Sequence, residues 1–320
     1  MKKRRKHKKR YYLFMVLIVV LITGAVWQRC MLKKEASTYT PVGTMVTVNS
    51  HDMHVYVKGT GITSYVFLAG SGTPSSYTDF YQLQNEFSQY GKTISYDHDG
   101  FGWSDATSES HTVDRLAEEL SVILDTVKAG ENCILVCHSL ASLEAIRFAQ
   151  LYPEKVNGIV FLDSGSPEFY SKDSEITSIL INRACAVGRV TGLNRLLVNI
   201  GVSLPFVGES ARIAGLPEEV RKIERAMYNR YLGNNKNLDL LTWINENAFS
   251  VLEGERLTNL PILVLSSESG TKWEEVQKEL CAWSKVGKQS TLEGAGHYIH
   301  WTNQKEVIEA IHQFIKEYKL

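Results

Sequence analysis

The sequence of 320 residues has only five cysteines, and none of them falls in a CxxC pair or in a Cys/His spacing typical of a metal site. Cys133 and Cys137 share one predicted strand, where about 3.3 Å per residue places them roughly 13 Å apart, too far for a disulfide. The sequence also lacks internal repeats and any cofactor-binding fingerprint. We therefore expect a fold without disulfides, metal or cofactor.

The formal net charge is +0, but the charge is unevenly distributed along the chain. Residues 1–10, MKKRRKHKKR, hold eight Lys or Arg and no acid. Taking these eight from the 35 basic residues leaves 27 against 35 acidic ones, a net charge of about −8 for the rest of the chain.

An unbroken apolar run, YYLFMVLIVVLITGAVW (Tyr11–Trp27), follows this basic tail. Its length is within the ~17–25 residues that a membrane-spanning helix needs, and the positive flank predicts a cytoplasmic N-terminus. We predict a cytoplasmic tail at 1–10, a transmembrane signal anchor at 11–29 and a polar linker at 30–44. The protein would be a single-pass protein of the cell membrane with its main domain outside. Once topology explains the basic tail, nucleic-acid binding is not expected.

A cleaved signal peptide and a buried helix are the alternatives to the anchor. Against cleavage, the stretch AVWQRC lacks a small-x-small site, and Arg29, Lys33 and Lys34 follow it directly. An uncleaved anchor is therefore the preferred interpretation.

Beyond the linker, strand-like and helix-like segments alternate, which predicts right-handed crossovers and a mostly parallel sheet. Between residues 164 and 259 the helical patterns continue without convincing strands. We predict an α/β core at 45–163 and 260–320, built on an eight-stranded sheet flanked by helices. The segment 164–259 would be a helical cap inserted after the sixth strand.

The stretch CILVCHSLASLEAIRFAQL changes from a strand pattern to a helical pattern at Ser139. A serine on such a tight turn exposes its hydroxyl above the sheet edge, beside the N–H groups of the following helix. Cys137 and Ala141 occupy the positions where the G-x-S-x-G pattern has glycine. Both are small, so the turn is feasible, but the pattern taken alone favours a helix N-cap.

The context of Ser139 reverses that preference. Two glycine-rich loops follow predicted strands in VFLAGSGTPSSY and YDHDGFGWSD, and LEGAGHYIHW places His297 ahead of the final helix. Together these stretches resemble the α/β-hydrolase superfamily, in its branch of lidded serine hydrolases, over roughly residues 45–320. The helical segment resembles the cap domain of that family.

The resemblance implies that Ser139 is the nucleophile and His297 the general base. It also implies an oxyanion hole formed by the backbone N–H of Leu140 and that of Ser71 or Gly70. A serine argues against the epoxide hydrolases and haloalkane dehalogenases of this fold, which use an aspartate at this position.

The acid that would orient the histidine is open. The family usually places it after the strand PILVLSS, where this sequence has Gly270. Asp163, which ends the preceding strand, is the preferred candidate, and Glu268, near the usual place, is the alternative. A site without a functional acid is the third interpretation.

The cap segment supplies side chains that would line an apolar substrate pocket, although packing within the cap is the preferred interpretation of each one singly. These side chains are Tyr228, Tyr231, Leu241, Trp243 and Phe249. A cap favours a small or medium substrate over a polymer. His138 and His300 are interpreted as packing and hydrogen-bonding residues near the site.

The sequence thus predicts a membrane-anchored serine hydrolase that acts on a small-molecule carboxylic ester. A peptidase or an acyltransferase of the same fold is the first alternative. A catalytically inactive binding module is the second, favoured by the non-glycine turn and by Gly270. The sequence indicates neither the substrate nor the oligomeric state.

Overall fold

The computed structural model describes residues 2–172, 174–202 and 215–320, with side chains from Lys9 onward. Its centre is one sheet, made of β1 (Thr44–Val48), β2 (His51–Lys58), β3 (Ser64–Leu68), β4 (Lys92–Tyr96), β5 (Cys133–His138), β6 (Val156–Leu162), β7 (Ile262–Ser267) and β8 (Gly287–Leu292). The strand order is β1-β2-β4-β3-β5-β6-β7-β8, and β2 is antiparallel to both of its neighbours while the other pairs are parallel. The expected mostly parallel, eight-stranded sheet is confirmed.

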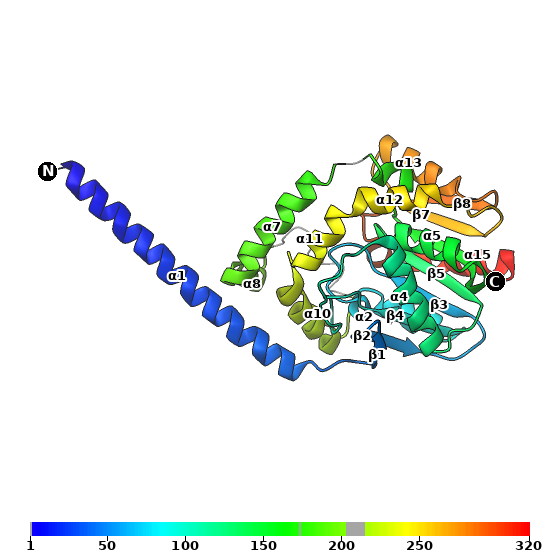
Figure 1. Cartoon of the computed structure of the whole chain (residues 1–320), viewed down its shortest axis with the longest axis horizontal. Helices are drawn as coiled ribbons and strands as arrows, with labels where there is room; N and C mark the ends of the chain where they lie inside the picture. The colour runs from blue at the N-terminus through cyan, green and yellow to red at the C-terminus, as the bar shows by residue number, and fades with distance from the viewer. Residues whose placement is uncertain (1, 173, 203–214) are drawn as a thin grey trace.

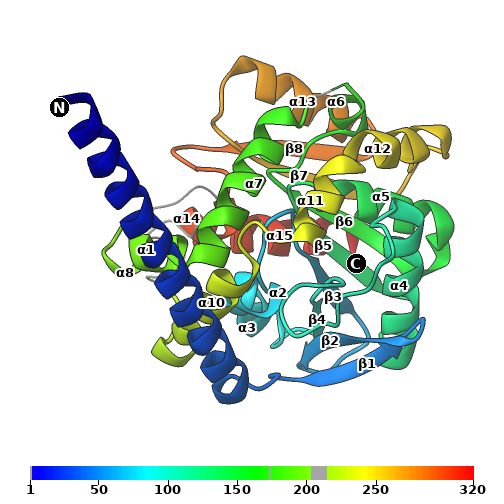
Figure 2. The same cartoon turned by 60° about the vertical axis from the view of Figure 1, so that its left-hand side comes forward.

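Helices cover both faces of this sheet. They are α2 (Ser76–Asp79), α3 (Tyr81–Phe87), α4 (Val113–Thr126), α5 (Ala141–Leu151), α13 (Thr271–Cys281), α14 (Ile299–Thr302) and α15 (Gln304–Tyr318). Figure 2 shows α4 and α5 in front of the strands and α15 behind them. Alternate residues of β5 point to opposite faces, so Leu135 packs with α4 and α5 while Val136 packs with α3 and α15. Burial on both faces explains why β5 is apolar without alternation.

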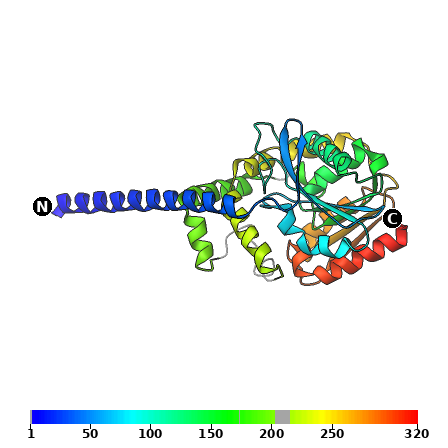
Figure 3. The ribbon, with the colours of Figure 1, turned by 90° about the horizontal axis from the view of Figure 1, so that it is seen from below.

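Further helices lie between β6 and β7 in the chain: α6 (Pro167–Tyr170), α7 (Ile176–Thr191), α8 (Leu193–Asn199), α10 (Glu218–Tyr231), α11 (Asn235–Thr242) and α12 (Ile244–Glu253). Residues 173 and 203–214 of the expected cap lie outside the described residues. No strand occurs in the described part of this segment. In Figures 1 and 3, α7, α8 and α10 lie between the N-terminal helix and the sheet.

The N-terminal helix α1 (Lys2–Thr38) contains a stretch, Lys9–Thr38, with a mean hydropathy of 2.0 over its most apolar window. Among the described residues it is the one helix whose length and composition suit a membrane span. The segment 30–44, expected as a polar linker, is helical through Thr38. It has no glycine or proline before Pro41, and one side of it packs on the cap, so the helix continues.

Candidate active site

Ser139 lies in the turn between β5 and α5, beyond the carboxyl end of the central strand. Its φ is 54°, in the left-handed region that residues other than glycine rarely adopt. The Ser139 N–H donates to Leu162 O at 3.2 Å, which ties this turn to the end of β6. The small neighbours Cys137 and Ala141 are both buried, so the turn forms without the usual glycines.

His297 lies in the loop between β8 and α14. Its Nε2 is 3.0 Å from Ser139 Oγ, and its Nδ1 is 2.6 Å from Asp163 Oδ2. The imidazole side chain is 46% exposed, whereas the side chain of Asp163 is 2% exposed. With its proton on Nδ1, the ring donates to Asp163 and presents the Nε2 lone pair to the serine hydroxyl. This arrangement can remove a proton from Ser139.

Asp163 follows β6 with a φ of 46°, so two strained residues follow adjacent parallel strands. Its Oδ1 accepts hydrogen bonds from Ser267 N and from Trp273 Nε1, each at 2.7 Å. These donors fix the carboxylate while Oδ2 faces His297. No short motif marks Trp273 as a partner of this site, and sequence reasoning missed it.

Glu268, the alternative acid, has an exposed side chain whose Oε2 accepts from Gly294 N at 3.3 Å. Within the described residues it makes no hydrogen bond or ion pair to His297. Gly270, at the position where the family usually has its acid, is the N-cap of α13 with a φ of 88°. The structure therefore brings Asp163, and not Glu268, to the imidazole.

The loop after β3 approaches the serine closely. A Cβ atom at Gly70 would lie 2.9 Å from Ser139 Cβ and 2.8 Å from His138 O, so only glycine permits this approach. In the part of the chain that the structure describes, no hydrogen bond occupies the backbone N–H of Leu140 or of Ser71. Both residues line one small cavity, so their N–H groups are the candidate donors for an oxyanion.

Tyr170, at the end of α6, is a neighbour of the serine that sequence reasoning missed. Burial raises the pKa of Tyr170, and hydrogen bonding to the Gly165 N–H and to Ser139 acts in the opposite direction. Its ring packs so closely on Gly165 that a Cβ there would lie 2.6 Å from the ring. Tyr170 therefore presents a neutral phenol beside the nucleophile.

His138 and His300 lie close to this group. His138 Nε2 is 3.1 Å from the backbone oxygen of His297, and His300 Nε2 is 3.2 Å from Asp79 Oδ1. Both side chains are buried, as expected for residues that support the loop carrying His297.

A cavity of about 30 Å³, room for one or two water molecules, adjoins the candidate oxyanion donors. It is lined by Ala69, Ser71, His98, Val113, Leu116, Leu140, Ala141, Leu143, Glu144, Leu240 and Asn247. The cap contributes Leu240 and Asn247 to this lining, and none of the expected aromatic residues.

The expected pocket residues Tyr228, Tyr231 and Trp243 lie elsewhere. Tyr228 is buried in a small cluster with Cys185 and Leu232, and the hydroxyl of Tyr231 donates to Gly102 O at 2.6 Å. Trp243 is partly buried at the start of α12. Helix packing, which sequence patterns cannot orient, directs these side chains away from the cavity.

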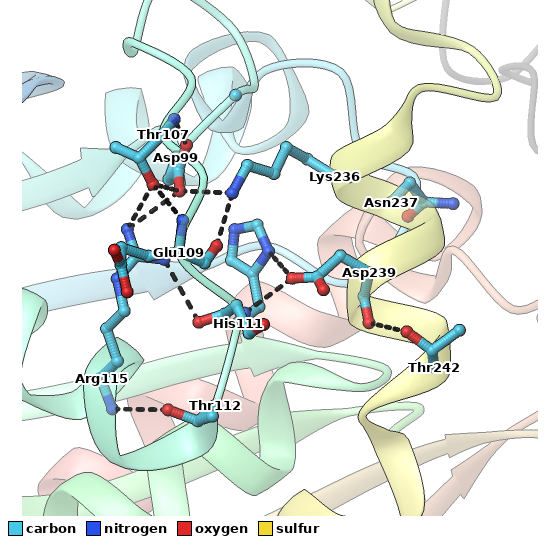
Figure 4. A network of polar contacts seen from close by, with 12 residues as sticks. Asp99, Thr107, Glu109, His111, Thr112, Arg115, Lys236, Asn237, Asp239 and Thr242 are labelled. Carbon is cyan, nitrogen blue, oxygen red and sulfur yellow. Dashed lines mark hydrogen bonds and ion pairs between the residues drawn. The ribbon is translucent and has the colours of Figure 1, made fainter.

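A group of polar side chains, here called the cap clasp, joins α11 to the loop after β4 and the start of α4 (Figure 4). Its members are Asp99, Thr107, His111, Arg115, Lys236 and Asp239. Lys236 Nζ lies 2.8 Å from Asp99 Oδ2, and Arg115 Nη2 lies 2.9 Å from the same oxygen. Burial would raise the pKa of Asp99, but hydrogen bonds from Lys236, Thr107 and Arg115 outweigh burial and hold it well below its ordinary value.

The second half of the clasp is the pair His111 and Asp239. Asp239 Oδ2 lies 3.0 Å from His111 Nδ1 and accepts the His111 backbone N–H at 2.7 Å. Burial lowers the pKa of His111 to about 4. Figure 4 shows Lys236 and Asp239 projecting from one side of α11 towards these partners, so the clasp positions the cap helix whose Asn237 accepts a hydrogen bond from Ser71 Oγ at 2.8 Å.

Among the described residues, no group of three or more His, Cys, Asp or Glu side chains is arranged to hold a metal ion. The functional groups that meet at the carboxyl ends of β5 and β6 are the hydroxyl of Ser139, the imidazole of His297 and the carboxylate of Asp163.

Comparison with known proteins gives the class. The family model of the alpha/beta hydrolase fold matches residues 66–304, and the chain belongs to this family. The chain is 30% identical over 261 residues to the uncharacterized protein YbdG of Bacillus subtilis (strain 168). The matched region covers 78% of this chain and 76% of YbdG.

Solved structures share the fold at low identity. A thermophilic esterase from Thermogutta terrifontis superposes with a TM-score of 0.65 at 18% identity, covering 86% of this chain and 99% of the esterase. The epoxide hydrolase VrEH1 from Vigna radiata superposes with a TM-score of 0.68 at 18% identity, covering 86% and 97%. At such identities these likenesses describe the fold.

Proposed function

We propose that this chain is a membrane-anchored serine hydrolase that cleaves small or medium-sized carboxylic esters through an acyl-enzyme. The observation that carries the proposal is the relay from Ser139 Oγ to His297 Nε2 at 3.0 Å and from His297 Nδ1 to Asp163 Oδ2 at 2.6 Å. A nucleophile, a base and an orienting acid in this order are the requirement for acyl transfer.

In the first half of the reaction, Ser139 Oγ attacks the ester carbonyl carbon while its proton passes to His297 Nε2. The carboxylate of Asp163 stabilises the imidazolium that forms, and the N–H groups of Leu140 and Ser71 stabilise the oxyanion. Collapse of the tetrahedral intermediate breaks the bond to the alkoxy group, which takes the proton from His297 and leaves as the alcohol. The acyl group remains on Ser139.

In the second half, His297 removes a proton from water as the water oxygen attacks the acyl carbon. The intermediate then expels Ser139 Oγ, which recovers the proton, and releases the carboxylic acid. Tyr170 lies beside the serine and supports its orientation in both halves.

The nature of the nucleophile supports an esterase over an epoxide hydrolase, because the latter branch of the fold uses an aspartate where this chain has Ser139. The small cavity beside Ser71 and Leu140 supports a short acyl group. In this proposal residues 45–163 and 260–320 form the catalytic core, 164–259 the cap, and 11–29 the anchor.

Labelling with a fluorophosphonate tests the proposal. We expect detergent-solubilised full-length protein to gain one adduct by intact mass, and the Ser139→Ala variant to gain none. Ser88→Ala, which changes a serine at the end of α3 far from the relay, should label as the unsubstituted protein does. Failure to label protein that unfolds cooperatively would support the inactive binding module instead.

Ester and amide substrates with the same acyl group then separate the remaining alternatives. Faster release from the ester is expected of an esterase, faster release from the amide would indicate a peptidase, and transfer to an added alcohol in preference to water would indicate an acyltransferase.

A further inference from the structure

The apolar helix α1 contacts the rest of the molecule through only part of its length. From Tyr11 to Thr23 nearly all side chains are exposed, and Figures 1 and 3 show this half of α1 projecting away from the domain. Contact begins at Gly24, whose backbone lies so close to Thr191 O that no larger side chain would fit. The contact partner at this level is the turn between α7 and α8.

Buried polar side chains lock α1 to α8. Gln28, 2% exposed, donates to Asn229 O at 3.0 Å and accepts from Arg195 Nε at 2.6 Å. The guanidinium of Arg195 also donates to both carboxylate oxygens of Glu35, one of them at 2.8 Å. Such a buried, bidentate pair fixes the position of α8 along the axis of α1.

The length of the projecting part sets the depth of the cap. At ~1.5 Å per residue, Tyr11–Thr23 measures about 20 Å, whereas the hydrocarbon core of a bilayer is about 30 Å thick. If α1 crosses the membrane, the remaining part of the crossing falls on residues that already contact the α7–α8 turn. The cap must then reach the membrane boundary.

The outer side of α7 and α8 has the composition that this position requires. One row of apolar side chains, each at least 49% exposed, follows helical spacing along both helices: Ile176, Leu180, Val187, Val190, Leu193, Leu196 and Ile200. We call this row the α7–α8 face. Arg183, also exposed, lies in the same row between Leu180 and Val187, and its long side chain would extend out of the acyl region to anionic headgroups. Seven large apolar side chains exposed on two successive helices exceed the scattered single ones that are normal on a soluble surface.

We propose that the α7–α8 face inserts into the boundary between headgroups and acyl chains of the same membrane that α1 crosses. This proposal rests on the proposed anchor and adds a second contact with the lipid. α7 and α8 would act as interfacial amphipathic helices, with their apolar sides in the acyl region.

The docked helix is connected to the candidate active site. Asn182 of α7 accepts a hydrogen bond from Asn237 Nδ2 at 2.9 Å, and Asn237 Oδ1 accepts from Ser71 Oγ at 2.8 Å. Two hydrogen bonds therefore link the membrane-facing helix to the loop that carries a candidate oxyanion donor. A cap held in this way favours esters that partition into the bilayer.

Fluorescence quenching by brominated lipids tests the docking. The full-length protein, with Cys30→Ser and Cys281→Ser to remove the more accessible thiols, would carry one bimane label at Leu196→Cys. It would be reconstituted into vesicles of equal parts phosphatidylcholine and phosphatidylglycerol, with or without brominated acyl chains. Ile62→Cys, in the exposed loop before β3 at the opposite end of the strands, is the negative control, and Val16→Cys is the control for the anchor.

We expect brominated lipid to quench the labels at positions 196 and 16 and to leave the label at position 62 bright. Quenching at position 16 without quenching at position 196 would overturn the docking and leave the anchor intact. The same result is expected if a second copy of the chain, and not lipid, covers the α7–α8 face. Absence of quenching at both positions would overturn the anchor and the docking with it.

A second readout uses turnover. Leu193→Asp combined with Leu196→Asp should lower, several-fold, the release of acetate from a long-chain alkyl acetate held in the vesicles, and leave hydrolysis of dissolved p-nitrophenyl acetate unchanged. Both substrates carry the same short acyl group. An equal loss with both substrates would mean that the face supports the fold of the cap and would contradict docking.

Discussion

Two histidine–aspartate pairs in this protein differ in almost every respect except their composition. His297 pairs with Asp163 across the carboxyl ends of the strands, and its side chain is 46% exposed. His111 pairs with Asp239 between the core and the cap, and its side chain is fully buried. The first ring can exchange protons with a bound substrate and with water, whereas burial keeps the second ring neutral at ordinary pH.

A similar difference separates Asp163 from Asp99, the buried carboxylate in the other half of the cap clasp. Asp99 of the cap clasp accepts hydrogen bonds from Lys236, Arg115 and Thr107, so its charge is fully compensated. Asp163 accepts from neutral donors and keeps one oxygen for His297. A compensated charge fixes structure, and a charge without a fixed cation is available to stabilise one that forms during the reaction.

The largest effect is expected at Asp163. Asp163→Asn should lower kcat by roughly three to four orders of magnitude, because the amide favours the wrong tautomer of His297. Glu268→Gln, the matched change at the other candidate acid, should have little effect. Steady-state kinetics with thermal unfolding as a control measures both, and the opposite ranking would transfer the role to Glu268.

In the clasp, the expected effect is on stability. Lys236→Met leaves the buried Asp99 without one cation and should lower the free energy of unfolding by about 3 kcal/mol. Lys222→Met breaks the exposed ion pairs with Glu218 and Glu219 on α10 and should leave the free energy of unfolding nearly unchanged. Denaturant unfolding compares the two variants, and equal losses would show that the clasp does not hold the cap.

The pH dependence of stability separates the two histidines further. The folded-state pKa of His111 is lowered to about 4, below its unfolded value near 6.5, so the unfolded chain binds the proton more strongly. Its contribution is therefore present above about pH 6.5 and is lost as the pH falls towards 4, by up to about 3 kcal/mol.

His111→Gln should flatten the stability profile in this window, and His312→Gln, at a partly exposed position, should not. Denaturant midpoints between pH 7 and pH 4 make the measurement. A profile that keeps its slope in His111→Gln would assign the dependence to another group.

The smallest effect is expected at Tyr170. Tyr170→Phe removes one neutral hydrogen-bonding group beside the serine and should lower kcat by about three- to tenfold, the worth of one such bond. The pH at half-maximal activity should not move. A loss as large as that of Asp163→Asn would instead make Tyr170 essential to the reaction.

Local patterns in the sequence predicted the strands, the turn at Ser139 and the loop of His297, because each is determined by residues close together in the chain. For the acid, the same patterns gave a preference for Asp163 over Glu268 but could not exclude Glu268. Asp163 and Glu268 both follow strands, and only the arrangement of β6 beside β7 brings one of them to His297.

The roles of Tyr170 and Trp273, and the positions of the cap aromatics, depend on how helices are rotated against the sheet. Sequence periodicity gives the buried side of a helix but not the element that covers it, so Tyr231 could not be assigned to Gly102 rather than to a pocket. The helical extension through Thr38 has the same origin, since contacts with Arg195 and with the cap lie far away in the chain.

The uninterrupted course of α1 has a mechanical consequence. If α1 crosses the bilayer as proposed, it continues along the cap without a break, held there by Gln28 and Arg195, and would transmit its tilt to the cap as a rigid rod. With α1 in the membrane, its tilt would set the angle at which the cap meets the lipid surface. A change in bilayer thickness would then change the orientation of the cap relative to Ser139 even without bound substrate.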